Sequence, residues 1–283
     1  MIDHNYFSSL AEVYSQLSLE VAAEDVINGT REMSDVHFII TDPTHNKIVS
    51  SNRKQSKRYI SAELMWYLSR DLNPAFIGQY AKKWLTITNS AGLVASNYGN
   101  YIFPHNWNNV INLFHHDRYT RRAHILLTHR RYGKHLISDA DIQCTIYLGF
   151  QIRQHDEIDK LDMFVRMRSN DVVWGLGNDM PVFAVFQEFM ARQLGVPVGY
   201  YHHSADSMHV YVGMENRLDR DARDGGRILA GINDNDAEVF AHYANGRASV
   251  PQMLDWLRSF QDHPDRKTLL FSDVLSTLDD GRK

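Results

Sequence analysis

Cysteine is nearly absent from this chain, which has one, Cys144, in 283 residues. A single cysteine excludes a disulfide within the chain and a structural zinc site made of several thiolates. Chains without disulfides are typical of reducing compartments, so we expect a cytoplasmic protein. A lone cysteine is usually a small buried hydrophobe, and only its surroundings can make it a nucleophile.

Long apolar runs and an excess of positive charge are missing as well. No stretch approaches the roughly 20 apolar residues of a membrane-spanning helix. The first residues, Met1-Ile2-Asp3-His4-Asn5, have neither the basic nor the apolar part of a secretory signal. The formal net charge of −4 gives no reason to expect nucleic-acid binding. We therefore expect no membrane partner and no DNA partner.

The chain also lacks internal repeats and a glycine-rich phosphate loop, for which Gly225-Gly226 alone is a weak signal. Its apolar residues instead alternate between helical and strand spacing. Helices are predicted at residues 6–27, 60–68, 74–84, 106–114, 181–194, 236–244, 250–261 and 269–278. Strands are predicted at 36–40, 125–128, 142–152 and 161–168, with two short strands within 198–212.

A dense polar cluster stands between two apolar runs in the middle of the chain. It reads Met167-Arg168-Ser169-Asn170-Asp171-Val172-Val173-Trp174-Gly175-Leu176-Gly177-Asn178-Asp179. Because apolar segments flank it on both sides, we expect the cluster to be partly buried, and buried polar groups must find partners or a ligand. The alternative interpretation is a strand end followed by a solvated turn.

Two other sets of charged residues allow two interpretations each. Glu63 lies among apolar neighbours, so it either faces solvent or is buried with a raised pKa and acts as a general base. The basic residues Arg53, Lys54, Lys57 and Arg58 form either a solvated face or a rim that attracts anions.

The polar cluster resembles the nucleotide-binding segment of the thymidylate synthase family, and most of all its deoxycytidylate hydroxymethylase branch, known from phages. Other pieces of the family pattern occur in the same order over roughly residues 36–212. They are Glu63, Trp84, Asn97-Tyr98-Gly99, Arg121-Arg122, Cys144, Arg168-Ser169, Asp171-Val172, Asn178-Asp179, and His209 with Tyr211. The joint order makes a chance match improbable.

The resemblance implies an α/β (α+β) fold with a large mixed, mainly antiparallel sheet. Helices would pack on one face of this sheet, and the other face would be the interface of a homodimer. Residues 1–217 would form the catalytic domain, and residues 218–283 would be a helical C-terminal extension of the same domain.

The resemblance also implies a reaction, the transfer of a one-carbon unit from 5,10-methylenetetrahydrofolate to C5 of a pyrimidine nucleotide. Cys144 would add to C6 of the ring, which makes C5 electron-rich. Arg168 would help to lower the pKa of this thiol. Glu63 would order the proton transfers. No metal site is implied.

Binding roles follow from the same resemblance. Phosphate would be bound by Arg121, Arg122, Arg168 and Ser169, with the Arg121-Arg122 pair donated by the other subunit. His209 and Tyr211 would contact the ribose, Asn170 belongs to the nucleotide-binding run, and Asp171 would lie near both the pyrimidine and the folate. Trp84 and Tyr98 would line the folate pocket, although each taken singly could be a core aromatic residue.

Asp179 stands where thymidylate synthases have Asn, which pairs with O4 and N3–H of uracil. Cytosine has the reverse donor and acceptor pattern, and a carboxyl group can match it either protonated or opposite an N3-protonated ring. The resemblance therefore implies cytidylate, with dCMP preferred and 5-hydroxymethyl-dCMP as product. The neighbouring Asn178 leaves the register open by one residue.

Several alternatives remain. The substrate could be ribo-CMP, as in nucleoside biosynthesis, because neither His209 nor Tyr211 identifies the sugar. The enzyme could methylate instead, although its last residues lack the apolar tail with which synthases close over folate. Gln143-Cys144-Thr145 replaces the Pro-Cys-His of the synthases, and the N-terminal phosphate-binding Arg has no match beyond Arg31. The chain could also be an inactive relative that binds nucleotides or RNA.

Overall fold

The computed structural model describes residues 5–128 and 141–280. Internal contacts divide the chain into two units. Unit 1 consists of Met1–Ser56, Leu113–His124 and Cys144–Ile228, and unit 2 of Lys57–Asn112, Ile125–Gln143 and Leu229–Lys283. Such contact units are a different kind of division from the boundary expected at residue 217, which stays a prediction.

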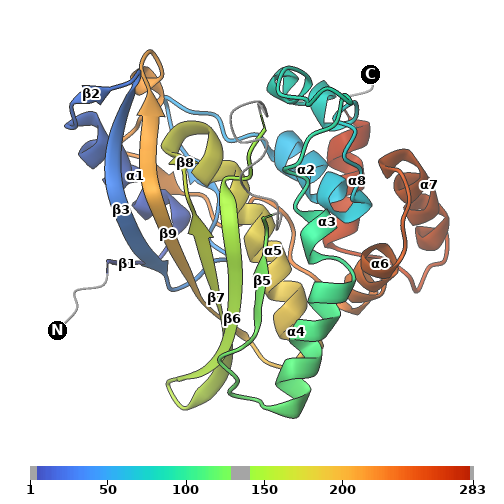
Figure 1. Cartoon of the computed structure of the whole chain (residues 1–283). Coiled ribbons are helices and arrows are strands. Elements are labelled where there is room, and N and C mark those ends of the chain that lie inside the picture. Colours follow the sequence, from blue (N-terminus) through green and yellow to red (C-terminus); the bar gives the residue numbers. More distant parts are fainter. Residues whose placement is uncertain (1–4, 129–140, 281–283) are drawn as a thin grey trace. The chain divides into compact units, whose positions relative to one another are not determined.

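Unit 1 is built on a mixed sheet, drawn in Figure 1. Its strands follow the order β1 (Tyr6–Phe7), β3 (Thr30–Ile40), β9 (Val198–Tyr211), β7 (Ile158–Met167) and β6 (Thr145–His155). The long pairs β3–β9 and β6–β7 are antiparallel, whereas β7 and β9 run parallel. Short β2 (Val26–Ile27) and β8 (Asn170–Asp171) flank β3 and β9. The expected mixed sheet is confirmed.

Two helices of unit 1, α1 (Leu10–Ala22) and α5 (Gly177–Gln193), pack on one face of this sheet (Figure 1). The stripe of α1 that contains Leu10, Val13 and Leu17 is buried, as helical spacing predicts. Helix α5 is buried almost all round, so its one fully buried amide, Gln187, must find partners. Gln187 Nε2 donates to the Leu161 carbonyl of β7 at 2.9 Å, which fixes the helix to the sheet.

Three predicted elements differ from the structure. Residues 6–27 are a strand, a helix and a strand rather than one helix, because Ser9 caps α1 by accepting from the Glu12 N–H. Residues 198–212 form one long strand, because buried residues such as Tyr201 and His203 alternate with more exposed ones. Residues 74–84 contain two short 3₁₀ turns, Ile77–Gln79 and Lys82–Leu85, separated by extended backbone at Ala81.

Unit 2 is helical in its described part. It contains α2 (Lys57–Ser69), α3 (Gly99–Ile102), α6 (Asp234–Asn245), α7 (Val250–Gln261) and α8 (Leu270–Asp279), so the three C-terminal helices predicted from the sequence are confirmed. The chain passes between the units within α4 (His105–His116) and β5 (His124–Leu126). A small two-stranded sheet of β4 (Ile48–Val49) and β10 (Arg223–Asp224) belongs to unit 1.

Helix α2 lies at the centre of unit 2, with every residue from Ile60 to Ser69 buried against its neighbouring helices. The start of α8 is held by the fully buried carboxylate of Asp236 on α6. This carboxylate accepts the N–H groups of Leu269, Leu270 and Phe271, which have no partner within their own helix.

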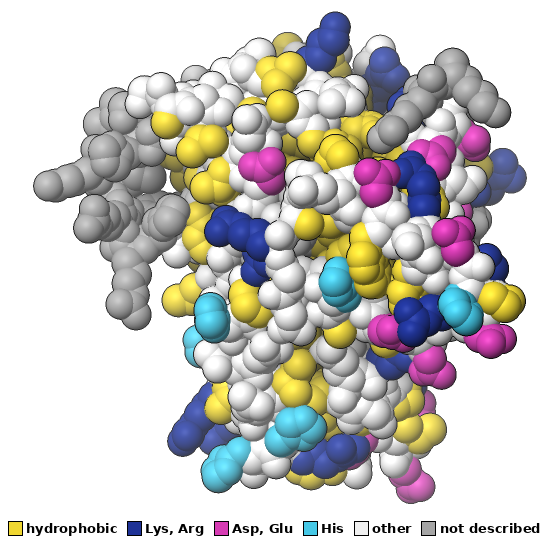
Figure 2. Space-filling view, turned by 90° about the vertical axis from the view of Figure 1, so that its right-hand side faces the viewer, with side chains coloured by type: hydrophobic (Ala, Val, Ile, Leu, Met, Phe, Trp, Pro, Cys, Tyr) yellow, Lys and Arg dark blue, Asp and Glu magenta, His cyan; other side chains and the backbone are white. Residues whose placement is uncertain are grey.

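No helix among the described residues is long and apolar enough to cross a membrane. On the face drawn in Figure 2, dark blue Lys and Arg side chains are interspersed with magenta Asp and Glu side chains. The described part of that face therefore carries charges of both signs.

Candidate active site

The candidate site of unit 1 begins where β6 and β7 meet at one end of their ladder. Cys144 directly precedes β6, and Arg168 directly follows β7. Because these strands are antiparallel, the two residues come together, and the Arg168 N–H donates to the Cys144 carbonyl at 2.9 Å. The guanidinium Nη2 of Arg168 lies 3.7 Å from Cys144 Sγ. A cation in contact with a thiol favours the thiolate, which is the reactive form.

The polar cluster continues from Arg168 as a compact turn. Asn170 and Asp171 form β8 beside β9, with Asp171 in register with His209. A π-helical turn at Val172–Leu176 follows and leads into α5, whose first turn contains Asp179. Such π-helical turns are frequent at functional sites. The turn folds back so that Asn170 Nδ2 donates to Asp179 Oδ2 at 3.2 Å.

Two oxygens in this turn are buried and have no hydrogen-bond partner within the described part of the chain, Asn170 Oδ1 and Asp171 Oδ2. The other carboxylate oxygen of Asp171 accepts the Trp174 N–H. Burial raises the pKa of Asp171, and the N–H groups at Trp174 and the nearby His209 oppose this rise. Buried acceptors without partners are costly in a folded protein, and a ligand that donates hydrogen bonds would satisfy them.

His209 and Tyr211 project from the same face of β9, since they are two residues apart on a strand. Their rings meet edge to face, with centroids 5.1 Å apart. The pKa of Tyr211 is raised by burial and by the nearby Asp171 and Cys144, while Arg168 lowers it. The Tyr211 hydroxyl therefore lies in the same electrostatic environment as the thiol and the guanidinium.

Arg121 and Arg122 lie in the bend before β5. Both side chains are exposed, and the Arg122 N–H donates to Thr120 Oγ1 at 3.3 Å.

Unit 2 contains Glu63, Trp84 and Tyr98. Glu63 on α2 is buried, so the solvent-facing alternative is wrong. Its Oε1 accepts from the Tyr59 hydroxyl at 2.8 Å, and this hydroxyl in turn accepts from Trp84 Nε1 at 3.0 Å. Burial raises the pKa of Glu63 to about 7, although hydrogen bonds from Tyr59 and Tyr67 lower it. Glu63 Oε2 is buried without a partner in the described structure.

Tyr98 is buried with its ring centroid 5.4 Å from that of Tyr67, and Trp84 packs against Trp66 at 4.9 Å. The two predicted folate-lining residues are thus part of the aromatic surroundings of Glu63 in unit 2. A group near pKa 7 can both accept and donate a proton at neutral pH, as a general acid or base requires.

A model of the family described as thymidylate synthase matches residues 29–230. The chain belongs to the thymidylate synthase family. One similar protein is the deoxyuridylate hydroxymethyltransferase of Bacillus phage SP01, which is 25% identical over 197 residues, or 64% of this chain and 50% of that protein. Another is the deoxyuridylate hydroxymethyltransferase of Delftia phage PhiW-14, which is 26% identical over 203 residues, or 67% of this chain and 56% of that protein. The deoxycytidylate 5-hydroxymethyltransferase of Enterobacteria phage T4 is 32% identical over 130 residues (43% and 50%). The chain thus spans about half the length of these relatives.

In this thymidylate synthase family member, one buried residue was missed by the sequence analysis. Arg53 is 4% exposed, so the solvated-face interpretation of the basic cluster is wrong at that position, although Lys54 and Arg58 are exposed. Its Nε donates to the Val173 carbonyl, 120 residues away in the sequence. No pattern in the sequence distinguishes Arg53 from its neighbours, because its burial depends on this distant contact.

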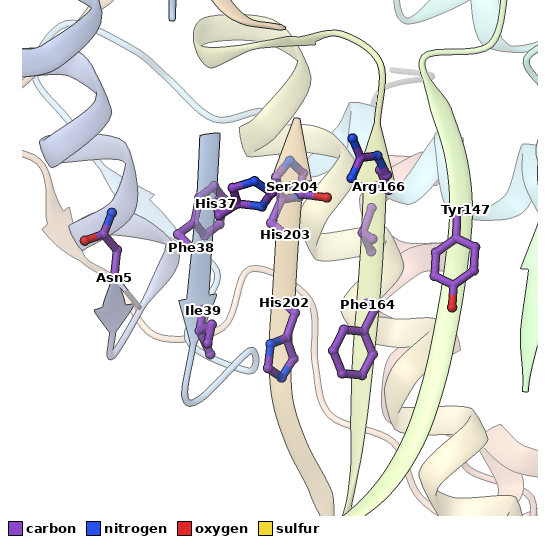
Figure 3. A pocket seen from close by; sticks show the side chains of 11 residues that line it. Asn5, His37, Phe38, Ile39, Tyr147, Phe164, Arg166, His202, His203 and Ser204 are labelled. Carbon is purple, nitrogen blue, oxygen red and sulfur yellow. The ribbon is translucent and has the colours of Figure 1, made fainter. Parts of the chain in front are cut away.

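The face of the sheet opposite α1 and α5 carries a hollow of about 320 Å³, shown in Figure 3. Phe164, Arg166, His202 and Ser204 line it from β7 and β9 at alternate positions, which places them on one face. Cys144 is not among its lining residues, so this hollow is separate from the cluster around the thiol. Within the described residues no group of three or more His, Cys, Asp or Glu could hold a metal ion.

The raised pKa of Glu63 predicts a stability that depends on pH. The carboxyl of the unfolded chain ionises near its ordinary pKa of 4.5, whereas the folded one stays protonated up to about 7. The stability that it contributes is therefore fully present below pH 4.5 and is lost as the pH rises to about 7. The difference in unfolding free energy between the wild type and Glu63→Gln should fall by on the order of 3 kcal/mol across this window, since one pKa unit corresponds to about 1.4 kcal/mol.

Denaturant unfolding at pH 5 and pH 8 measures this difference. Glu238→Gln on exposed α6 surface is the matched control and should give no such change. A wild-type minus Glu63→Gln difference that stays constant between the two pH values would show that Glu63 ionises normally in the folded protein.

Proposed function

We propose that this chain transfers a one-carbon unit from 5,10-methylenetetrahydrofolate to C5 of a cytidine monophosphate, with dCMP preferred and 5-hydroxymethyl-dCMP as product. The observation that carries the proposal is the contact of 3.7 Å between Arg168 Nη2 and Cys144 Sγ. A thiol held against a cation is suited to nucleophilic attack, and nucleotide binding alone needs no thiol.

Cys144 acts as the nucleophile. Its thiolate adds to C6 of the pyrimidine, and electron density moves to C5, which otherwise is a poor nucleophile. Covalent attack divides one difficult step into easier ones. After C5 has taken up the one-carbon unit and lost its proton, tetrahydrofolate leaves and an exocyclic methylene remains on C5. Water adds to this methylene to give the hydroxymethyl group, and the C–S bond breaks to restore the product ring.

The nucleotide phosphate is bound by Arg168 and Ser169 from the same subunit, together with Arg121 and Arg122. The planar guanidinium fork of Arg matches the geometry of phosphate oxygens. His209 and Tyr211 on β9 then contact the sugar.

Methylenetetrahydrofolate supplies the one-carbon unit when it is bound, and the residues present fit such a group. Asp171 Oδ2 is a buried acceptor without a partner in the described structure. It can accept a hydrogen bond from an N–H group of a bound heterocycle. Trp84 and Tyr98 provide aromatic surface for ring stacking. Glu63, with a pKa of about 7, holds a water molecule and passes protons during the reaction.

Asp179 carries the preference for cytosine. Its carboxyl group can pair with N3 and the 4-amino group of cytosine, whereas uracil presents the opposite pattern. The hydrogen bond of 3.2 Å from Asn170 Nδ2 orients this carboxyl group. The Asn170 Oδ1 acceptor remains for the nucleotide.

A second candidate is hydroxymethylation of deoxyuridylate. It is favoured by the SP01 and PhiW-14 relatives, which are deoxyuridylate hydroxymethyltransferases and whose matches cover more of this chain than the match to the T4 protein does. The T4 protein, which acts on deoxycytidylate, has the higher identity over its shorter match. The acidic group at position 179 supports the choice of cytidylate in our proposal.

We further propose a homodimer in which the open sheet face forms the interface and each subunit donates Arg121 and Arg122 to its partner. The support is that this face carries the hollow of Figure 3 and that both Arg side chains are exposed. Analytical ultracentrifugation should give twice the mass of the chain, and a monomer at micromolar concentration contradicts the proposal.

The reaction is tested by mixing the purified protein with methylenetetrahydrofolate and, separately, dCMP, CMP and dUMP, and reading product masses. We expect a hydroxymethyl product from dCMP and none from the Cys144→Ser variant, because its hydroxyl is not acidic enough to attack C6. The variant should still bind nucleotide, which controls for folding. A methyl product would place the protein with the synthases, and transfer by Cys144→Ser would exclude the covalent mechanism.

The base preference is tested by Asp179→Asn. This substitution should reduce kcat/KM for dCMP relative to dUMP by about a hundred-fold or more, because buried polar groups of the wrong pattern remain unpaired. Asp221→Asn, an exposed carboxylate in the same unit, is the matched control. Unchanged preference for cytosine in Asp179→Asn would remove this residue from base recognition.

A further inference from the structure

We infer that Arg53 is a positioning residue for base recognition, which fixes the turn between Asp171 and Asp179 and thereby the place of the Asp179 carboxylate. The inference rests on the proposed function, because it gives Asp179 a nucleotide base to recognise. Arg53 itself is not proposed to touch the nucleotide.

The segment that contains Arg53 meets this turn at three points. Arg53 Nε donates to the Val173 carbonyl, in the π-helical turn, and Nη2 lies 3.4 Å from Asn178 Oδ1. Gln55 Nε2 donates to the Gly177 carbonyl at 2.6 Å. The contacts thus span the turn from its second residue to the residue before Asp179. A displacement of either side chain would release the backbone that leads into Asp179.

The backbone at Arg53 is itself fixed by a series of hydrogen bonds. Its backbone N–H donates to Ser50 Oγ at 3.0 Å, and Ser50 Oγ donates to the buried Asp219 carboxylate at 2.7 Å. The same carboxylate accepts the Ser51 N–H at 2.9 Å. Because the backbone at Arg53 is anchored in this way, its side chain starts from a fixed position and can hold the turn that it contacts.

The burial of Arg53 is costly, which argues against a purely structural role. Its Nη1 is buried and makes no hydrogen bond to the described residues. Burial lowers the pKa of Arg53, with Tyr14 and Asp171 opposing this effect. An apolar side chain of similar size would fill such a place at lower cost, because a buried cation loses its hydration. The presence of Arg at this position is therefore explained better by the hydrogen bonds that position the turn than by a contribution to the stability of the fold.

Two glycines make room for the arrangement. A Cβ atom at Gly177 would lie 2.6 Å from Arg53 Nη2 and 2.7 Å from Nη1, too close for the guanidinium to stay. A Cβ atom at Gly175 would lie 2.7 Å from Asn170 Nδ2 and 3.4 Å from Asp179 Oδ2. The missing Cβ atom at Gly177 thus leaves room for the Arg53 guanidinium. The missing Cβ atom at Gly175 leaves room for the hydrogen bond that orients Asp179. Both lie within the turn that Arg53 holds.

The test uses the ratio of dissociation constants for dUMP and dCMP, measured by calorimetry on the full chain. A ratio does not depend on the fraction of folded protein, so a general loss of stability leaves it unchanged. Arg53→Lys keeps the charge but cannot form the two-atom contact to Val173 and Asn178. Gly177→Ala keeps every polar group but displaces the guanidinium, and alanine favours the helix, so this variant should fold even if the first does not.

We expect the ratio to fall by about tenfold or more in both variants, since each loses hydrogen bonds from a charged group. Lys54→Met, next to Arg53 but exposed, should keep the wild-type ratio. In an Asp179→Ala background, Arg53→Lys should change the ratio little, because its effect passes through Asp179.

A wild-type ratio in both Arg53→Lys and Gly177→Ala overturns the inference and leaves the proposed function intact. An equal effect of Arg53→Lys with and without Asp179 also overturns it, since Arg53 would then act by another route. If the wild type binds neither nucleotide, the proposed function fails and the inference fails with it.

Discussion

The last rung of the β6–β7 ladder is the contact on which the candidate site depends. The hydrogen bond from the Arg168 N–H to the Cys144 carbonyl joins residues that are 24 positions apart, and it sets the guanidinium beside the thiol. Antiparallel pairing makes this possible because two strand ends that lie far apart in sequence meet at the same edge. Register matters here, since a slip by one residue would turn one of the side chains to the other face.

Several polar side chains after Arg168 are buried, and only some of their donors and acceptors have hydrogen-bond partners. The turn from Asn170 to Asp179 satisfies two side-chain amide donors and two carboxylate oxygens internally, and leaves Asn170 Oδ1 and Asp171 Oδ2 without partners among the described residues. Glu63 Oε2 in unit 2 is in the same situation. Stability alone would not retain such groups, because each costs free energy of about 1–3 kcal/mol. Their occurrence at residues of the family pattern supports the proposal that a ligand binds there.

Local patterns in the sequence predicted the parts of this protein that depend on neighbours in the chain. Helix α2, the three C-terminal helices, the strands β6 and β7 and the partly buried polar cluster followed from apolar periodicity and from flanking segments. The continuity of β9 was missed because His and Ser at its alternate positions resemble a loop in composition, while the burial of its other alternate residues depends on elements that are distant in the sequence. Arg53 was missed for the same reason, since the groups that bury it lie near residue 175 and carry no local sign of it.

The choice between cytosine and uracil also depends both on one side chain and on distant residues that hold it in place. Relatives named for deoxyuridylate and for deoxycytidylate match this chain at 25% and 32% identity, so the likeness to these relatives does not by itself identify the base. Exchange of one base for the other reverses a donor and an acceptor, and a single side chain at position 179 can provide that reversal. A single side chain discriminates strongly only where it is held in place, because a protonated carboxyl group that is free to turn can exchange the places of its O–H donor and its carbonyl acceptor. In the proposed function, specificity therefore requires the Asn170 contact and the anchored turn as much as it requires the acid itself.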